Sequence, residues 1–211
     1  FQWRDASDIY SEMVEQNKKY GIKHFKFQDA LTNGNQKEFR RLCQLLAKHK
    51  GNKRNKKNNF SWSGYYIFRE WSNSSEKDWE LVFKSGAYVL IVGLENLNED
   101  IRFEMGKKFS NKAVDLHLDQ AKHHNITLLL LNIVGYVSET RNHIDYAKIW
   151  LEQHVDHKDH IYLTWGGTLG IFPNTYLEVN KEKLGIEMTG TSPQEWVNKS
   201  IGSTPSIRAS W

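Results

Sequence analysis

The sequence of 211 residues has a single cysteine, only three prolines and no long apolar run. One cysteine, Cys43, excludes an intrachain disulfide framework and a metal site made of cysteines alone. A reducing compartment, the cytoplasm, is therefore expected. Because no stretch of eighteen apolar residues is present, a transmembrane helix is excluded, and no membrane partner is expected. The first five residues also lack the apolar core of a signal peptide.

The scarcity of proline bears on the fold. All three prolines lie at or after Pro173, so residues 1–172 contain few proline-marked turns, and a sandwich of many short strands is not expected. The composition, 39% hydrophobic and 26% charged, is that of a globular protein. The net charge of +4 is mild, and by itself it does not imply a nucleic-acid partner.

Along the chain, helical and extended patterns alternate. Apolar residues spaced three or four apart predict helices over residues 5–20, 35–49, 74–85, 98–124 and 138–154, with a break in the fourth near 106–110. Strands are predicted over residues 22–29, 60–70, 87–95, 126–135 and 160–165. The run AYVLIVGLE at 87–95 is typical of a parallel strand that is buried on both faces.

The spacing of these strands predicts the architecture. Their starts lie 27 to 39 residues apart, which is the length of one βα unit, and right-handed crossovers make such strands parallel. Five units are too few for a complete eight-stranded barrel, and the chain opens on a helix. We therefore expect an α/β fold, a partial TIM-like barrel lacking its first strand over residues 1–165. Residues 166–211 are expected to form an irregular extension.

Polar residues and glycines gather at the predicted carboxyl ends of the strands, where parallel α/β folds carry their chemistry. Three stretches there resemble the radical S-adenosylmethionine (radical SAM) family, particularly the branch often fused to a cobalamin-binding domain. They are HFKFQDALTNGNQKEFRRLCQLL, then KSGAYVLIVGLENLNEDIRFEMGKK with its GxE and downstream Lys107, and LLLNIVGYVSET, which is similar to the family's GxPGET turn. The segments SPQEW and STPSIR are similar to C-terminal segments of that branch.

The resemblance implies an enzyme that uses a [4Fe-4S] cluster to cleave S-adenosylmethionine and generate a 5′-deoxyadenosyl radical. It makes cobalamin a further candidate cofactor. The family holds its cluster through a CxxxCxxC motif, which this chain lacks, and one cysteine cannot supply three thiolate ligands. Either an upstream segment carries the cluster cysteines, which makes the chain a fragment, or the chain is a degenerate relative. We favour the fragment, and we expect the chain alone to be inactive.

The resemblance suggests five contacts to S-adenosylmethionine, each with a structural alternative. Glu95 would accept hydrogen bonds from the ribose hydroxyls, or cap the helix near Asn98. Asp29 would pair with the methionine ammonium, or serve as a cap or turn residue. Arg69 would bind the methionine carboxylate as a planar fork, or pair with the adjacent Glu70.

The other two suggested contacts concern the adenine. Gly135 would let the backbone approach the ring, and Ile133 would offer it an apolar surface or simply pack in the core. Glu139 is interpreted as a structural acid near the positive end of a helix. No metal ligands are predicted, because His154, His157 and His160 run from a helix through a loop into a strand.

A different class of function stays open. The run KHKGNKRNKK, residues 48–57, could make the chain a non-catalytic α/β module that binds RNA, although a solvated loop is the favoured interpretation. The sequence does not identify the substrate, the reaction outcome or the oligomeric state.

Overall fold

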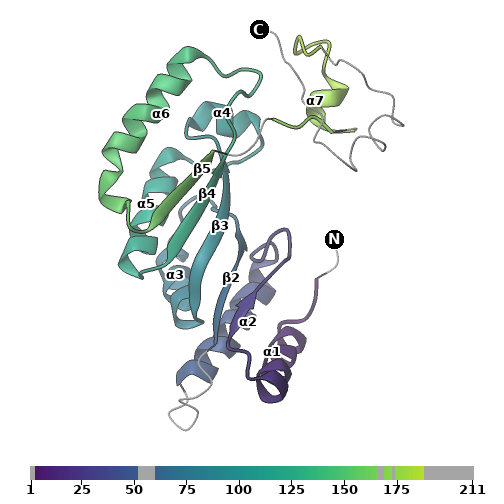
Figure 1. Cartoon of the computed structure of the whole chain (residues 1–211), viewed down its shortest axis with the longest axis vertical. Helices are drawn as coiled ribbons and strands as arrows, with labels where there is room; N and C mark the ends of the chain where they lie inside the picture. The colour runs from purple at the N-terminus through teal and green to yellow at the C-terminus, as the bar shows by residue number, and fades with distance from the viewer. Residues whose placement is uncertain (1–2, 52–59, 166–168, 173, 188–211) are drawn as a thin grey trace.

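A computed structural model describes residues 3–51, 60–165, 169–172 and 174–187. Its core is one sheet of five parallel strands in the order β1-β2-β3-β4-β5. The strands are β1 (His24–Lys26), β2 (Ser61–Tyr66), β3 (Ala87–Glu95), β4 (Thr127–Asn132) and β5 (Ile161–Trp165). The sequential order and the parallel pairing confirm the predicted α/β partial barrel (Figure 1).

The helices alternate with these strands along the chain, with α1 before β1 and α7 after β5. They are α1 (Ala6–Tyr20), α2 (Gln36–Gly51), α3 (Ser75–Lys84), α4 (Glu99–Glu104), α5 (Asn111–His123), α6 (Arg141–Gln153), the 3-10 turn η2 (Val155–His157) and α7 (Tyr176–Val179). Helices α3, α5 and α6 pack along one side of the sheet (Figure 1). In the part of the chain that the structure describes, no helix has both the length and the apolar character needed to cross a membrane.

Local signals set several helix ends. The Asp5 carboxylate accepts the Ser7 N–H at 2.8 Å, and α1 ends at Gly21, whose left-handed backbone donates to the Asn17 carbonyl. Ser110 begins α5 because its hydroxyl accepts the Ala113 N–H at 3.1 Å. These side chains satisfy backbone donors that a helix terminus leaves unpaired.

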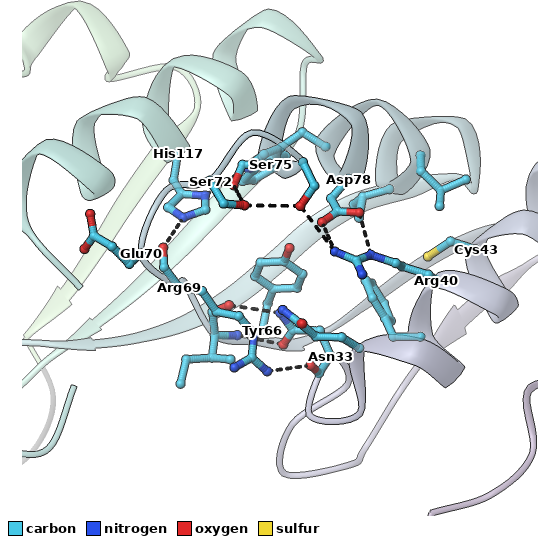
Figure 2. Close-up of a pocket in the computed structure, with 17 residues that line it drawn as sticks. Asn33, Arg40, Cys43, Tyr66, Arg69, Glu70, Ser72, Ser75, Asp78 and His117 are labelled. Atoms are coloured by element: carbon cyan, nitrogen blue, oxygen red, sulfur yellow. Dashed lines mark hydrogen bonds and ion pairs between the residues drawn. The ribbon is translucent and has the colours of Figure 1, made fainter. Parts of the chain in front are cut away.

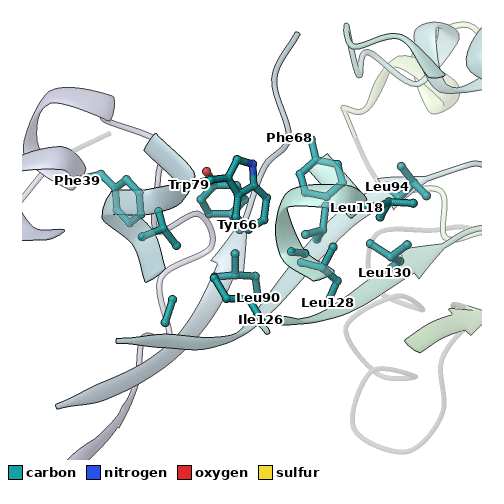
Figure 3. Close-up of a cluster of buried hydrophobic side chains, with 14 of the residues drawn as sticks. Phe39, Tyr66, Phe68, Trp79, Leu90, Leu94, Leu118, Ile126, Leu128 and Leu130 are labelled. Atoms are coloured by element: carbon teal, nitrogen blue, oxygen red, sulfur yellow. The ribbon is translucent and has the colours of Figure 1, made fainter. Parts of the chain in front are cut away.

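The core lies between the sheet and its helices. Leu90 and Leu94 of β3 point to the helical side with Leu128 and Leu130 of β4 (Figure 3), and these four side chains and that of Val92 are fully buried. The alternate positions, Val89, Ile91, Leu129 and Leu131, lie on the opposite face and are only half-buried. We expected β3 to be buried on both faces. In the described part of the chain, only one of its faces is fully buried.

Three strands end earlier than predicted, and for β2 the structure shows the reason. β2 stops at Tyr66, not at residue 70, because the buried Asn33 side chain takes over the next backbone groups. Its Nδ2 donates to the Ile67 carbonyl, and its Oδ1 accepts the Ile67 N–H, both at 2.9 Å. β1 is likewise confined to His24–Lys26 and β4 ends at Asn132, so residues 28–29, 69–70 and 133–140 lie in loops.

One further expectation needs correction. Helix α2 continues to Gly51, beyond the predicted end at His49, so Lys50 belongs to this helix and not to a loop; residues 52–57 of the basic run lie outside the described residues. In the described part of the extension after residue 165, the one α-helix is the four-residue α7, which lies beyond the carboxyl ends of the strands (Figure 1). The predicted break between α4 and α5 is confirmed, with Gly106 at a φ of 85°.

Candidate functional site

Glu95 occupies an unusual place at the carboxyl end of β3. Its φ is 69°, a left-handed conformation that costs a non-glycine residue about 1 kcal/mol. The β3–β4 register shifts at this point, and the Glu95 carbonyl accepts the Ile133 N–H at 2.6 Å. Strained residues of this kind gather at functional sites. The backbone therefore marks Glu95 as a candidate independently of any motif.

The Glu95 carboxylate pairs with Lys107, which follows α4. Nζ of Lys107 lies 3.1 Å from Oε1 of Glu95, and the two side chains are 25% and 22% exposed. The carboxylate folds back over Gly93, where an added Cβ would lie 2.5 Å from Oε1 and 3.3 Å from Nζ. Gly93 thus provides the space that the pair occupies. A partly exposed carboxylate beside an ammonium can accept hydroxyl hydrogen bonds from a ligand.

Ile133 and Gly135 lie in the loop that follows β4, where the Ile133 N–H bonds the Glu95 carbonyl. Gly135 has a φ of 86°, and its N–H donates to Glu139, whose other oxygen accepts from Asn96 Nδ2 at 2.8 Å. The side-chain amide of Asn96 also donates to the Ile133 carbonyl at 3.2 Å. Glu139 thus has a structural role, as expected, but it fulfils this role by accepting hydrogen bonds that hold the loop after β4. The structure therefore gathers three predicted site residues, Glu95, Ile133 and Gly135, at one edge of the sheet.

Arg69 faces a different region. Its Nη2 donates to the carbonyls of Asn33 at 3.0 Å and Gly34 at 3.4 Å. Arg69 does not form the alternative salt bridge with the adjacent Glu70. The Glu70 carboxylate instead accepts hydrogen bonds from the N–H and the hydroxyl of Ser110. These two bonds help lower the pKa of Glu70 below its ordinary value. Figure 2 shows Arg69 at the margin of a cavity of about 130 Å³.

This cavity lies between α2, α3 and the end of β2, on the helical side of the sheet. Its charges are largely paired, since Arg40 holds Asp78 through two nitrogens at 2.7 and 2.6 Å. Burial raises the pKa of the Cys43 thiol to about 12 and raises that of Tyr66 further. Neither group is a nucleophile at neutral pH.

Asp29 lies apart from these groups. It is exposed in the turn after β1, and the predicted role as a cap of α2 belongs to Asn35, whose Oδ1 accepts the Glu38 N–H at 3.3 Å. The contact between Asp29 and the methionine ammonium stays a prediction, as do the ligand roles of Arg69, Glu95, Ile133 and Gly135.

Sequence reasoning missed several residues that shape the site. Lys107 was seen only as part of a motif, while the buried Asn96 and Arg102 were not singled out. A signal existed for Asn96, because it directly follows the GxE end of a buried strand. Arg102 gave no signal, since an arginine within a charged helix is ordinarily exposed.

The histidine-rich stretch does not form a metal site in the described residues, where no group of three or more potential ligands is present. His154 Nε2 lies 3.0 Å from Asp115, and its ring stacks on Trp150 with centroids 3.9 Å apart. An iron-sulfur cluster does not fit either. Cys43 is 1% exposed inside α2, and its thiol stays protonated, whereas cluster ligands are thiolates.

The architecture is that of a partial (β/α) barrel, and structures with the same fold include radical SAM enzymes. The radical S-adenosylmethionine methyltransferase TsrM from Kitasatospora setae, solved with cobalamin and a [4Fe-4S] cluster, matches with a TM-score of 0.69 at 14% identity, over 88% of this chain and 35% of that chain. A second TsrM structure, with tryptophan and aza-SAM bound, gives a TM-score of 0.70.

Two further enzymes share the fold. The cobalamin-dependent S-adenosylmethionine radical enzyme OxsB has a TM-score of 0.61 at 12% identity, over 89% of this chain and 33% of that one. Coproporphyrinogen III oxidase (HemN) from Escherichia coli, a radical SAM enzyme, has a TM-score of 0.50 at 13% identity, over 85% and 45%. No family model and no curated protein matches the sequence.

These likenesses concern the fold, because the identities are low. The chain spans about a third of the length of the TsrM and OxsB chains. The fold is therefore shared with part of these enzymes, and the activity is a separate question.

Proposed function

We propose that this chain is the S-adenosylmethionine-binding part of a radical SAM enzyme. The observation that carries the proposal is the Glu95–Lys107 pair at the carboxyl end of β3, held on a strained backbone over Gly93. Parallel α/β folds bind their ligands at this edge of the sheet. The fold shared with TsrM, OxsB and HemN supports the same class.

We propose that Glu95, Ile133 and Gly135 contact the adenosine half of the cofactor. The Glu95 oxygen that is not paired with Lys107 would accept the ribose hydroxyls, as acids do in dinucleotide sites. Ile133 would pack against the adenine, while the backbone at Gly135 carries no side chain to obstruct the ring. Lys107, 3.1 Å away, would hold the carboxylate in its orientation. When bound, S-adenosylmethionine supplies a source of the 5′-deoxyadenosyl radical.

For the methionine half, we propose that Asp29 pairs with the ammonium and Arg69 with the carboxylate. Arg69 already donates to two carbonyls. Its Nε is buried and, in the described part of the chain, has no hydrogen-bond partner. An arginine with a free donor can still turn toward a carboxylate.

The cluster does not fit this chain, and we assign no reaction step to it here. We propose that its thiolates come from an upstream segment, so that the isolated chain binds the cofactor without cleaving it. The assignment to the cobalamin-associated branch, the use of cobalamin and the cytoplasmic location are parts of the same proposal. An RNA-binding module remains the alternative, since residues 52–57 lie outside the described residues.

Equilibrium dialysis of the protein against radiolabelled S-adenosylmethionine tests the proposal. We expect saturable binding that Glu95→Gln weakens about tenfold, which corresponds to about 1.4 kcal/mol. The matched control is Glu152→Gln, which removes an exposed acid from α6 and is expected to leave the affinity unchanged. Absence of saturable binding, or equal affinities of wild type and Glu95→Gln, would remove Glu95 from the site.

A further inference from the structure

Arg102 is the most deeply buried charge among the described residues that line this edge. It lies on α4 at the carboxyl end of the sheet and is 1% exposed. Burial lowers the pKa of Arg102, while the carboxylate of Glu99, 4.0 Å away, opposes that shift. A guanidinium buried to this extent needs a complete set of acceptors.

Those acceptors come from two separate stretches of chain. Nη1 donates to the carbonyls of Asn96 at 3.0 Å and Leu97 at 3.4 Å, directly after Glu95. Nε and Nη2 both donate to the carbonyl of Phe109 at 3.2 Å, two residues after Lys107.

The backbone of Arg102 adds a further link, because its carbonyl accepts the Lys107 N–H at 3.0 Å. Nη2 also donates to Oδ1 of Asn111 at 2.7 Å, at the start of α5. One planar side chain therefore ties the stretch that carries Glu95 to the stretch that carries Lys107.

The chemistry favours this arrangement over simple packing. An apolar side chain of similar size would fill the same space without the cost of burying a charge. It would, however, leave the Asn96, Leu97 and Phe109 carbonyls without these donors, in two segments that have no regular structure. The planar fork can bridge carbonyls on both sides, which a lysine ammonium cannot do with the same geometry.

We propose that Arg102 is a positioning residue that holds Glu95 and Lys107 together at the cofactor-binding edge. Its effect on cofactor affinity rests on the proposed function, whereas its effect on the pair does not. Arg102 touches neither member of the pair through its side chain. It acts through the carbonyls that follow each of them.

The test is the reactivity of the Lys107 amine. The protein is treated with an acetylating reagent, and the modification of Lys107 is followed by peptide mass spectrometry relative to Lys148 on α6. The Lys107 side chain is only 25% exposed and its amine is bonded to Glu95, so Arg102→Met, which frees this stretch, is expected to speed the acetylation of Lys107 about fivefold. Arg102→Lys, which keeps the charge but not the fork, is expected to give a similar rise and decides the test if Arg102→Met does not fold.

The matched control is Arg40→Met, which removes the pair between α2 and α3 and should leave Lys107 unchanged. S-adenosylmethionine affinity is measured on the same variants, and a drop of about tenfold is expected for both Arg102 substitutions. If Lys107 is acetylated faster in the Arg102 variants while the wild type does not bind S-adenosylmethionine, the positioning role holds and the proposed function is wrong. Unchanged acetylation in a folded Arg102 variant would overturn the positioning role.

Discussion

The indole Nε1 of Trp79 donates a hydrogen bond to Nδ1 of His117 at 2.9 Å, in the buried layer between α3 and α5. The other ring nitrogen of His117 lies 2.8 Å from the Arg69 carbonyl and donates to it. This bonding requires a neutral imidazole with its proton on Nε2. The pair thus links two helices to the loop that carries Arg69.

The titration of His117 makes stability depend on pH. Burial lowers its pKa from 6.5 to about 4, so between these values the unfolded chain binds a proton that the folded protein excludes. The contribution is complete above pH 6.5 and is lost progressively as the pH falls toward 4, by about 3 kcal/mol.

Urea unfolding of wild type and His117→Gln at several pH values measures this effect. We expect the wild type to lose more stability than the variant between pH 6.5 and 4, because glutamine does not titrate. Parallel pH profiles of the two proteins would show that His117 does not titrate in this way.

Gly93→Ala tests the space beneath the Glu95–Lys107 pair. The new Cβ would meet the ends of two flexible side chains, so the fold should lose less than about 1 kcal/mol. The carboxylate must move, and we expect S-adenosylmethionine affinity to fall about tenfold. Gly21→Ala is the opposite control: its φ of 70° makes it destabilising, yet it lies at the end of α1 and should leave the affinity unchanged.

The strain at Glu95 predicts a trade between stability and binding. Glycine adopts the φ of 69° without cost, whereas alanine does not. Glu95→Gly should therefore be more stable than Glu95→Ala by about 1 kcal/mol, measured by urea unfolding. Both should bind S-adenosylmethionine weakly. Equal stabilities would mean that the backbone relaxes once the carboxylate is gone.

The order of elements was predictable because each signal is local. The stripe of Phe39, Leu42 and Leu46 predicts α2, and the uninterrupted run at 87–95 predicts β3; both elements are present. Strand ends were predicted poorly, because the loss of ladder hydrogen bonds at Ile67 depends on Asn33, which lies 34 residues away in the sequence. No local pattern carries such a bond.

The candidate site divides in the same way. Glu95, Ile133 and Gly135 were identifiable as candidates, because Glu95 is the last residue of β3 and the other two follow the carboxyl end of β4. The position of Arg69 was not predictable, since its guanidinium turns to carbonyls of the loop after β1. The basic run 48–57 was assigned to a loop, although Lys50 continues α2.

Periodicity alone determined that this protein alternates helices with parallel strands, because burial of an apolar stripe or strand depends on spacing within a short segment. Its one cysteine settled that no cluster can be held by three thiolates of this chain. Only the tertiary structure decided that Lys107 reaches Glu95 over Gly93 and that Arg102 bonds the stretches behind both. Those contacts join residues through space, and the energies that select them depend on burial and hydrogen-bond geometry.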